Sequence, residues 1–220
     1  MSVDTKKKEL VGNFKNLGRT WRTEPDEVNA HDFPSDAECR AVPYGVYDLA
    51  ANRGFVSVGV SKDTPEFAVD CLVRWWRKEG SQRYPEATRL LIHADTGGSN
   101  AAKSRVFKVR LKEKLADPFG LEVTLCHYPA GASKWNPIEH RLFSRISANW
   151  AGVPLRSLRG LLAAICGTVT KTGLRTRALL TRRKYRVGTK VTDQDLANTN
   201  LKRHKTCPEW NYTISPDTQE

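Results

Sequence analysis

The chain has 220 residues, of which 39% are hydrophobic and 27% are charged, a balance typical of one globular domain with or without an appendage. No run of eighteen apolar residues occurs, and the basic N-terminus is not followed by an apolar stretch, so we expect neither a membrane span nor a secretory signal. The five cysteines lie far apart without a Cys-x-x-Cys pair, which favours reduced cysteines in a cytosolic protein over a disulfide framework or a zinc knuckle.

The formal net charge is +12, and it is unevenly distributed along the chain. Between Lys171 and Lys205, eleven Lys and Arg residues stand against two acids. Such a basic segment indicates a polyanionic partner, for which nucleic acid is the default, and a solvated surface is the alternative. Within this segment we expect sequence-independent phosphate contacts from Arg182, Arg183, Lys184 and Arg186.

The first sixty residues read as β-structure around a loop. Residues 2–14 predict a strand, a turn and a returning strand, and residues 15–27 predict a polar loop. Residues 42–61 carry apolar side chains on both sides of Asn52-Arg53-Gly54, whose Asn and Gly suit a turn, which predicts a β-hairpin.

A helix is predicted after this hairpin. Thr64 is a suitable N-cap, Pro65 suits the first helical position, and Gly80 is expected to end the helix. Trp75 and Trp76 keep the helical spacing of the apolar face, which favours a place in the core over a base-stacking platform.

Strands and helices then alternate. We expect a buried strand over residues 89–94 that ends at Asp95, a basic helix over 103–115, a strand over 121–127 and a helix from Pro137. This order predicts an α/β fold with a mixed sheet flanked by helices.

The remainder of the chain is more basic. Residues 155–169 predict a helix, residues 175–190 look turn-rich, residues 191–196 look like a capped helix start, and residues 210–214 look extended. We therefore expect a division into residues 1–152, which hold the sheet, and residues 153–220, a basic, mostly helical extension packed on it.

Three carboxylates are candidates for metal-dependent chemistry. Asp95 ends an apolar strand beside two glycines, and strand ends are where sites form in α/β sheets. Glu139 lies in the first turn of a predicted helix, where its charge could stabilise the helix dipole instead of taking part in catalysis; the two roles are equal alternatives. Asp4 stands inside a predicted strand, an unfavourable place that a shared divalent cation would explain. Three carboxylates can hold two Mg²⁺ ions for an in-line phosphoryl displacement.

A resemblance to a known family rests on several motifs. The run Ser133-Lys134-Trp135-Asn136-Pro137-Ile138-Glu139-His140 resembles the third-acid motif of mariner-like and related insertion-sequence transposases, with its core Asn-Pro-Ile-Glu. Further stretches are similar to the ISAzo-type transposases of bacteria, and together they cover nearly the whole chain: residues 4–9, 47–52, 94–100, 140–144 and 209–214.

The resemblance implies an RNase H-like fold with a DDE triad, whose acids fall on Asp4, Asp95 and Glu139. Ninety residues lie between the first two acids and forty-three between the second pair. Asp48 on the hairpin is a rival for the first acid, and Asp32 is a weaker one. We prefer Asp4 because a three-strand meander then precedes the first long helix.

The resemblance also implies a helical DNA-binding region ahead of the first strand. Met1 falls almost on that strand, so we expect a chain that lacks this region. Specific binding to transposon ends and transposition by this chain alone are then in question.

Four residues around the third acid are expected to contact nucleic acid. Lys134 and Trp135 could contact a phosphate and stack on a base. Asn136 and His140 could position substrate, although turn and interior roles are as common for these residue types.

The resemblance implies metal-dependent cleavage of DNA at transposon ends, followed by strand transfer into target DNA. We expect Mg²⁺ or Mn²⁺, with two ions, as the cofactor, DNA and a second copy of the chain as partners, and the bacterial cytoplasm as the location. One alternative is an RNase H-like nuclease or resolvase without strand transfer. The other is a catalytically inert, truncated transposase that only binds DNA.

Overall fold

The computed structural model describes residues 1–129 and 131–217. Its strands are β1 (Ser2–Thr5), β2 (Glu9–Val11), β3 (Cys39–Asp48), β4 (Arg53–Gly59), β5 (Arg89–Asp95), β6 (Glu122–Tyr128), β7 (Arg175–Thr181), β8 (Leu201–Arg203) and β9 (Asn211–Ile214). Its α-helices are α1 (Pro65–Trp75), α2 (Ser81–Arg83), α3 (Arg105–Leu111), α4 (Asp117–Phe119), α5 (Ser144–Asn149), α6 (Leu158–Cys166) and α7 (Asp193–Ala197). Its 3₁₀ and π segments are η1 (Pro34–Asp36), η2 (Trp76–Gly80), η3 (Gly98–Asn100), η4 (Lys112–Ala116), η5 (Ser133–Trp135) and η6 (Glu139–Phe143).

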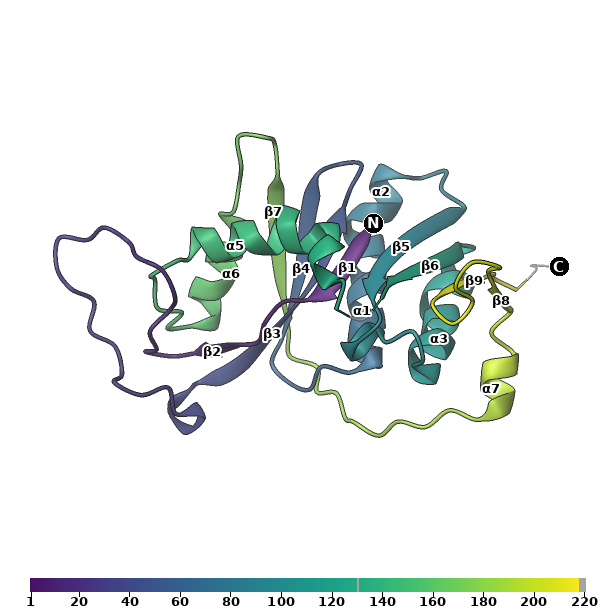
Figure 1. The fold of residues 1–220 in the computed structure, drawn as a ribbon, viewed down its shortest axis with the longest axis horizontal. Helices are drawn as coiled ribbons and strands as arrows, with labels where there is room; N and C mark the ends of the chain where they lie inside the picture. Colours follow the sequence, from purple (N-terminus) through teal and green to yellow (C-terminus); the bar gives the residue numbers. More distant parts are fainter. Residues whose placement is uncertain (130, 218–220) are drawn as a thin grey trace.

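The strands form one mixed sheet in the order β7-β4-β3-β1-β5-β6-β9-β8, with β2 also paired to β3 (Figure 1). Strands β3 and β9 run against all the other strands, which point the same way. The carboxyl ends of β1, β4, β5, β6 and β7 therefore lie along one edge of the sheet. This architecture confirms the predicted α/β class and agrees with the expected RNase H-like mixed sheet.

Helices cover both faces of the sheet. Helices α1 and α3 pack on one face, where Phe67 and Phe107 are fully buried. Helices α5 and α6 pack on the other, through Ile146 and Leu161 among others. No helix in the described part of the chain is both long and apolar enough to span a bilayer.

The sequence predicted that the strand after the first turn would run back, but β2 continues in the direction of β1. Strands β1 and β2 both pair with β3 in the same direction, Thr5 opposite Tyr44 and Glu9 opposite Ala41. Three residues, 6–8, thus stand opposite two residues of β3, which is the one-residue excess of a β-bulge. The chain continues along β3 because Lys6 donates its backbone N–H to Pro43 across the bulge, at 2.9 Å.

The helix after the hairpin begins as predicted. The Thr64 hydroxyl accepts a hydrogen bond from the backbone N–H of Phe67 at 3.2 Å. Trp75 and Trp76 are buried, as expected for core residues. The predicted stop at Gly80 is wrong, because η2 runs directly into α2 and the helical path ends only after Arg83.

The segment after residue 152 is not mostly helical. Residues 175–181, predicted to be turn-rich, form β7, and all seven pair in parallel with β4. Ala178 of β7 is buried in the cluster that α6 also joins. The exposed arginines at the start of β7, Arg175 and Arg177, obscure the strand pattern in the sequence. Helix α7 and strand β9 agree with the predictions for that region. The boundary at residue 152 stays a prediction, and strands from beyond it pair with strands from before it.

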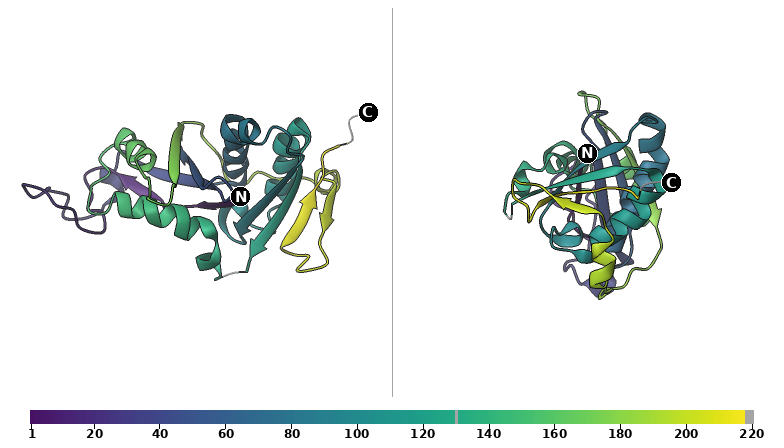
Figure 2. Two further views of the ribbon diagram at one scale, coloured as in Figure 1. Left: turned by 90° about the horizontal axis from the view of Figure 1, so that it is seen from above. Right: turned by 90° about the vertical axis from the view of Figure 1, so that its right-hand side faces the viewer.

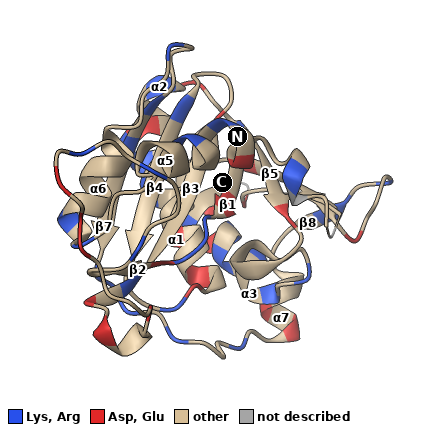
Figure 3. Cartoon of the chain, turned by 60° about the vertical axis from the view of Figure 1, so that its left-hand side comes forward, with Lys and Arg blue, Asp and Glu red and all other residues tan. Residues whose placement is uncertain are grey.

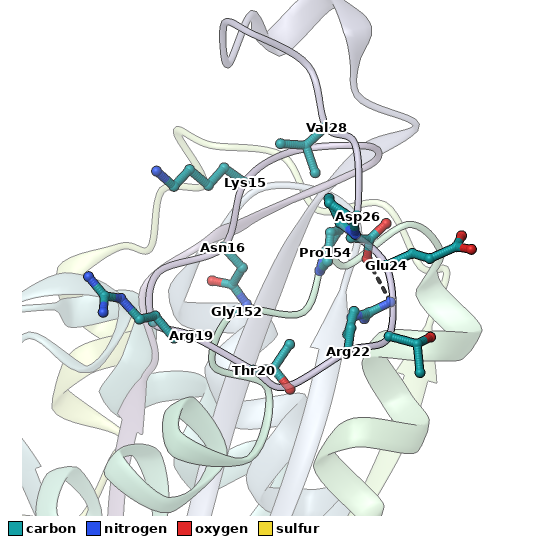
Figure 4. A pocket seen from close by; sticks show the side chains of 13 residues that line it. Lys15, Asn16, Arg19, Thr20, Arg22, Glu24, Asp26, Val28, Gly152 and Pro154 are labelled. Atoms are coloured by element: carbon teal, nitrogen blue, oxygen red, sulfur yellow. Dashed lines mark ion pairs between the residues drawn. The ribbon is translucent and has the colours of Figure 1, made fainter.

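The connection from β2 to β3 projects from one end of the molecule (Figures 1 and 2). Its base is fastened to the α5–α6 connection by the hydrogen bond from the Gly152 N–H to the Leu17 carbonyl, at 2.8 Å. Beyond this anchor the loop borders a cavity of about 640 Å³, where Arg22 and Asp26 form an ion pair at 2.8 Å (Figure 4). The loop predicted for residues 15–27 is therefore present and extends further, to residue 38.

Candidate active site

Asp4 lies on the strand at the middle of the sheet, opposite Gly45 of β3. The missing side chain of Gly45 leaves room for the helix above: a Cβ there would lie 2.6 Å from the Phe143 ring and 2.9 Å from Ile138. The segment that carries Glu139 can therefore approach β1 closely. The Asp4 carboxylate also accepts a hydrogen bond from the Thr5 N–H at 2.7 Å.

Asp95 is the last residue of β5 and ends its strand at the same edge of the sheet. One of its carboxylate oxygens accepts long hydrogen bonds from the Thr96 hydroxyl and the Gly97 N–H, both at 3.4 Å. The turn Thr96-Gly97-Gly98 thus bends around the carboxylate and leaves its second oxygen without a hydrogen-bond donor among the described residues.

Glu139 is positioned by the buried Asn136. The Asn136 amide donates to the Val3 carbonyl oxygen at 3.3 Å and accepts from the Ser2 hydroxyl. The Ser2 hydroxyl in turn accepts from the N–H of Ile138 at 3.1 Å. The start of the Glu139 helix is therefore fixed to β1 next to Asp4.

The three acids influence one another electrostatically. Burial raises the pKa of Asp4 from 3.8 to about 7, although the hydrogen bond from the Thr5 N–H lowers it. The negative charges of Glu139 and Asp95 add to the rise. Burial likewise raises the pKa of Glu139, while Lys6 and a hydrogen bond with Asp4 oppose that rise. The fold thus places three carboxylates near one another, where burial and their mutual repulsion raise the pKa of Asp4 and Glu139.

A cavity of about 490 Å³ opens onto Asp4 and Asp95. It contains a fourth acid, Asp63, and basic side chains from the β-bulge and from the start of β3. The lining residues are Asp4, Thr5, Lys6, Lys7, Lys8, Arg40, Asp63, Asp95, Gly97, Gly98 and Ser99. Sequence reasoning missed Asp63, although its place just after β4 is the same signal that identified Asp95.

The donor chemistry of this site fits a hard divalent cation. Carboxylate oxygens are the ligands that Mg²⁺ and Mn²⁺ prefer, and burial, with a smaller effect of the neighbouring acids, raises the pKa of Asp4. Within residues 1–129 and 131–217, no three His, Cys, Asp or Glu side chains stand close enough to enclose an ion. Binding therefore requires the carboxylates to turn toward the ion.

Comparison with protein families decides the classification. A family model described as the Rhodopirellula transposase DDE domain matches residues 1–216. The chain belongs to this family of DDE transposases. No curated protein and no solved structure matches it. The resemblance to insertion-sequence transposases is thereby confirmed.

Within this DDE domain, the rivals for the first acid have other environments. Asp48 is buried at the far end of β3, where it accepts hydrogen bonds from Arg83 at 3.2 Å and from Tyr84 at 3.0 Å. Asp32 is exposed on the projecting loop. Neither Asp48 nor Asp32 lies near Asp95 and Glu139, whereas Asp4 does.

The residues expected to contact DNA near the third acid fall into two groups. Lys134, Trp135 and His140 are exposed, with the Lys134 ammonium 5.3 Å from the centre of the Trp135 ring and the His140 ring on the Lys134 carbonyl. Their DNA contacts stay a prediction. Asn136 is fully buried, so the expected DNA contact does not fit it, and it instead fixes the Glu139 helix.

The basic cluster at residues 182–186 follows the carboxyl end of β7, at the same sheet edge as the acids. Arg183 is partly committed, because it pairs with Asp70 at 2.9 Å. Arg182, Lys184 and Arg186 are exposed. Lys and Arg residues also stand in other elements of this DDE domain (Figure 3), so the C-terminal segment is not the sole source of positive charge.

Proposed function

We propose that this transposase domain cleaves DNA at the ends of its element and transfers the freed ends into target DNA. The observation that supports this most is the proximity of three acids that lie far apart in the sequence: Asp4 and Asp95 line one cavity, and Glu139 is near enough for its charge to raise the pKa of Asp4. A water molecule would first attack the phosphodiester and release a 3′-hydroxyl. That hydroxyl would then attack a phosphodiester of the target, so that one bond forms as another breaks.

The cavity suits a phosphodiester because cations stand beside the acids. Lys7, Lys8 and Arg40 line it together with Asp4 and Asp95. Lys8 lies 3.7 Å from Asp63, a long ion pair that a phosphate can replace. These cations would hold the phosphates that flank the reacting one, and two of them, Lys7 and Lys8, belong to the β-bulge.

Asp4, Asp95 and Glu139 would hold the metal ions, Mg²⁺ or Mn²⁺. Such ions stabilise the attacking and leaving oxygens of an in-line displacement. Lys6 lies near Glu139 and is fixed by an ion pair to Glu9 at 2.7 Å and by the Trp150 ring, so it limits the repulsion among the acids. The active complex would be a homodimer, located in the bacterial cytoplasm.

The test is cleavage of a labelled duplex carrying the ends of the element, with Mn²⁺ or Mg²⁺. The variants Asp4→Asn, Asp95→Asn and Glu139→Gln should each lose at least a hundredfold in rate. Asp32→Asn, which changes an exposed acid on the projecting loop, is the matched control and should keep the parent rate.

A second assay with precut ends separates the alternatives. Joining of these ends to a target plasmid supports the transposase reaction, and cleavage without joining supports a nuclease or resolvase. DNA binding without either reaction, in a folded parent chain, supports an inert DNA-binding remnant.

A further inference from the structure

A second cavity, of about 360 Å³, lies on the other flank of the segment that carries Glu139. Three of its lining side chains come from η6 and α5 and can carry positive charge: His140, Arg141 and Arg145. The lining contains no Asp or Glu residue. The remaining residues come from the end of β3, the β3–β4 turn and the α6–β7 connection, and they are Tyr47, Leu49, Asn52, Thr170, Thr172 and Leu174.

The floor of this cavity is held by hydrogen bonds. Asn52 accepts from the Tyr47 hydroxyl at 2.8 Å and donates to the Thr172 carbonyl oxygen at 3.0 Å, which joins the β3–β4 turn to the α6–β7 connection. The Thr170 and Thr172 hydroxyls are 2.9 Å apart. Their mutual bond uses one hydroxyl hydrogen, so the other is free to be donated.

The arginines of the cavity are uncommitted. Within residues 1–129 and 131–217, neither Arg141 nor Arg145 forms an ion pair or a side-chain hydrogen bond, and both are exposed. By contrast, Arg83 and Arg183 pair with Asp48 and Asp70. Two unpaired guanidinium groups over hydroxyl and amide donors match an anion with several acceptor oxygens.

We infer that this cavity binds the DNA backbone one to three nucleotides from the reacting phosphate; this inference rests on the proposed function. Glu139 and Arg145 are six residues apart on one continuous helical segment, about 9 Å along its axis at the usual rise. One DNA strand carries a phosphate about every 3.4 Å along the helix axis. A strand that runs along this segment with its reacting phosphate at Glu139 therefore brings its first neighbour to Arg141 and its second or third neighbour to Arg145.

The first test is salt-dependent DNA binding without metal, so that no chemistry is needed. The variant Arg141→Gln/Arg145→Gln should bind a short duplex at least about tenfold more weakly at low salt. The slope of log K against log salt should fall by about 1.8, at about 0.9 for each lost phosphate contact. The control Lys78→Gln/Arg89→Gln removes the same charge from exposed positions outside the cavity. A slope equal to that of the control would overturn the inference.

The second test locates the contact. Single phosphates of the duplex are replaced by neutral methylphosphonates, and each position is measured with the parent and the double variant. The losses should be non-additive at one or two neighbouring positions, because a phosphate and its arginine are then removed together. Additive losses at every position would refute the subsite.

Folding and chemistry are separated from this result by two further measurements. Arg141→Lys/Arg145→Lys keeps both charges and should restore the salt slope, which a folding defect would not allow. Should metal-dependent cleavage be absent while the methylphosphonate coupling persists, the proposed function fails and the subsite stands.

Discussion

Asn136 donates a hydrogen bond to the carbonyl oxygen of Val3 across 133 residues of sequence, with a length of 3.3 Å. The bond joins the turn before the Glu139 helix to the strand residue before Asp4. The Asn-Pro-Ile-Glu motif thus contains both an acid and the side chain that places it.

The substitution Asn136→Ala should destabilise the chain by about 2–3 kcal/mol, because the buried Ser2 hydroxyl and Val3 carbonyl lose a partner. Cleavage should fall at least tenfold as Glu139 loses its position. Urea unfolding and cleavage rates measure both effects, and Asn198→Ala, at an exposed helix end, should change stability by less than about 0.5 kcal/mol. An unchanged midpoint for Asn136→Ala would contradict this account.

Stability without metal should fall as the pH rises from about 4 to 7. The pKa of Asp4 is higher in the folded chain, about 7, than its ordinary 3.8, because burial disfavours the charged form. The folded state therefore holds the Asp4 proton more tightly, and that stabilisation is lost as the proton leaves.

Asp4→Asn should remove this pH dependence. As the pH rises from 5 to 8, the free energy of unfolding of the variant should increase by about 1–2 kcal/mol relative to that of the parent. This is less than the full pKa shift of Asp4 implies, because solvent still reaches the site. Denaturant unfolding in EDTA measures the difference, with Asp32→Asn as the control. A parallel pH profile of parent and Asp4→Asn would show that Asp4 has an ordinary pKa.

Mn²⁺ should stabilise the folded chain by offsetting the repulsion among the three acids. At a concentration one hundred times the dissociation constant, the gain is about 2.7 kcal/mol. Thermal unfolding with and without Mn²⁺ measures it. The gain should vanish in Asp95→Asn, and its persistence there would place the ion elsewhere.

Gly45→Ala should separate the helix from the sheet. The added Cβ would lie 2.6 Å from the Phe143 ring, and such overpacking costs about 1–3 kcal/mol. Cleavage should fall with it, because Phe143 belongs to the segment that carries Glu139. Gly160→Ala, where a Cβ meets only the Ser157 hydroxyl at 3.4 Å, is the matched control and should be neutral or stabilising.

Local signals predicted much of the fold and pointed to the candidate acids. Thr64 and Pro65 mark a helix start whose cap depends on neighbouring residues alone, and the structure contains that cap. Asp95 at the end of an apolar strand was identified in the same way. Such features need only a few adjacent residues, so one sequence suffices to find them.

The features that were missed depend on residues far apart in the chain. Strand β7 is stable because β4 pairs with it, a partnership that its arginines conceal. Asp63 joins the cavity only because β4 and β1 point the same way in the sheet. The place of Asn136 just before a helix suggested a substrate contact or a turn role, because its buried partners, Ser2 and Val3, lie more than 130 residues away in the sequence.

The strands that complete the sheet on both sides come late in the chain. β7 covers the outer edge of β4, and β9 covers the outer edge of β6. During translation, the hydrogen-bonding edges of β4 and β6 therefore remain open until residues 175–181 and 211–214 have left the ribosome. Exposed edges pair readily with other chains, so the nascent domain depends on fast completion, or on a chaperone, to avoid aggregation.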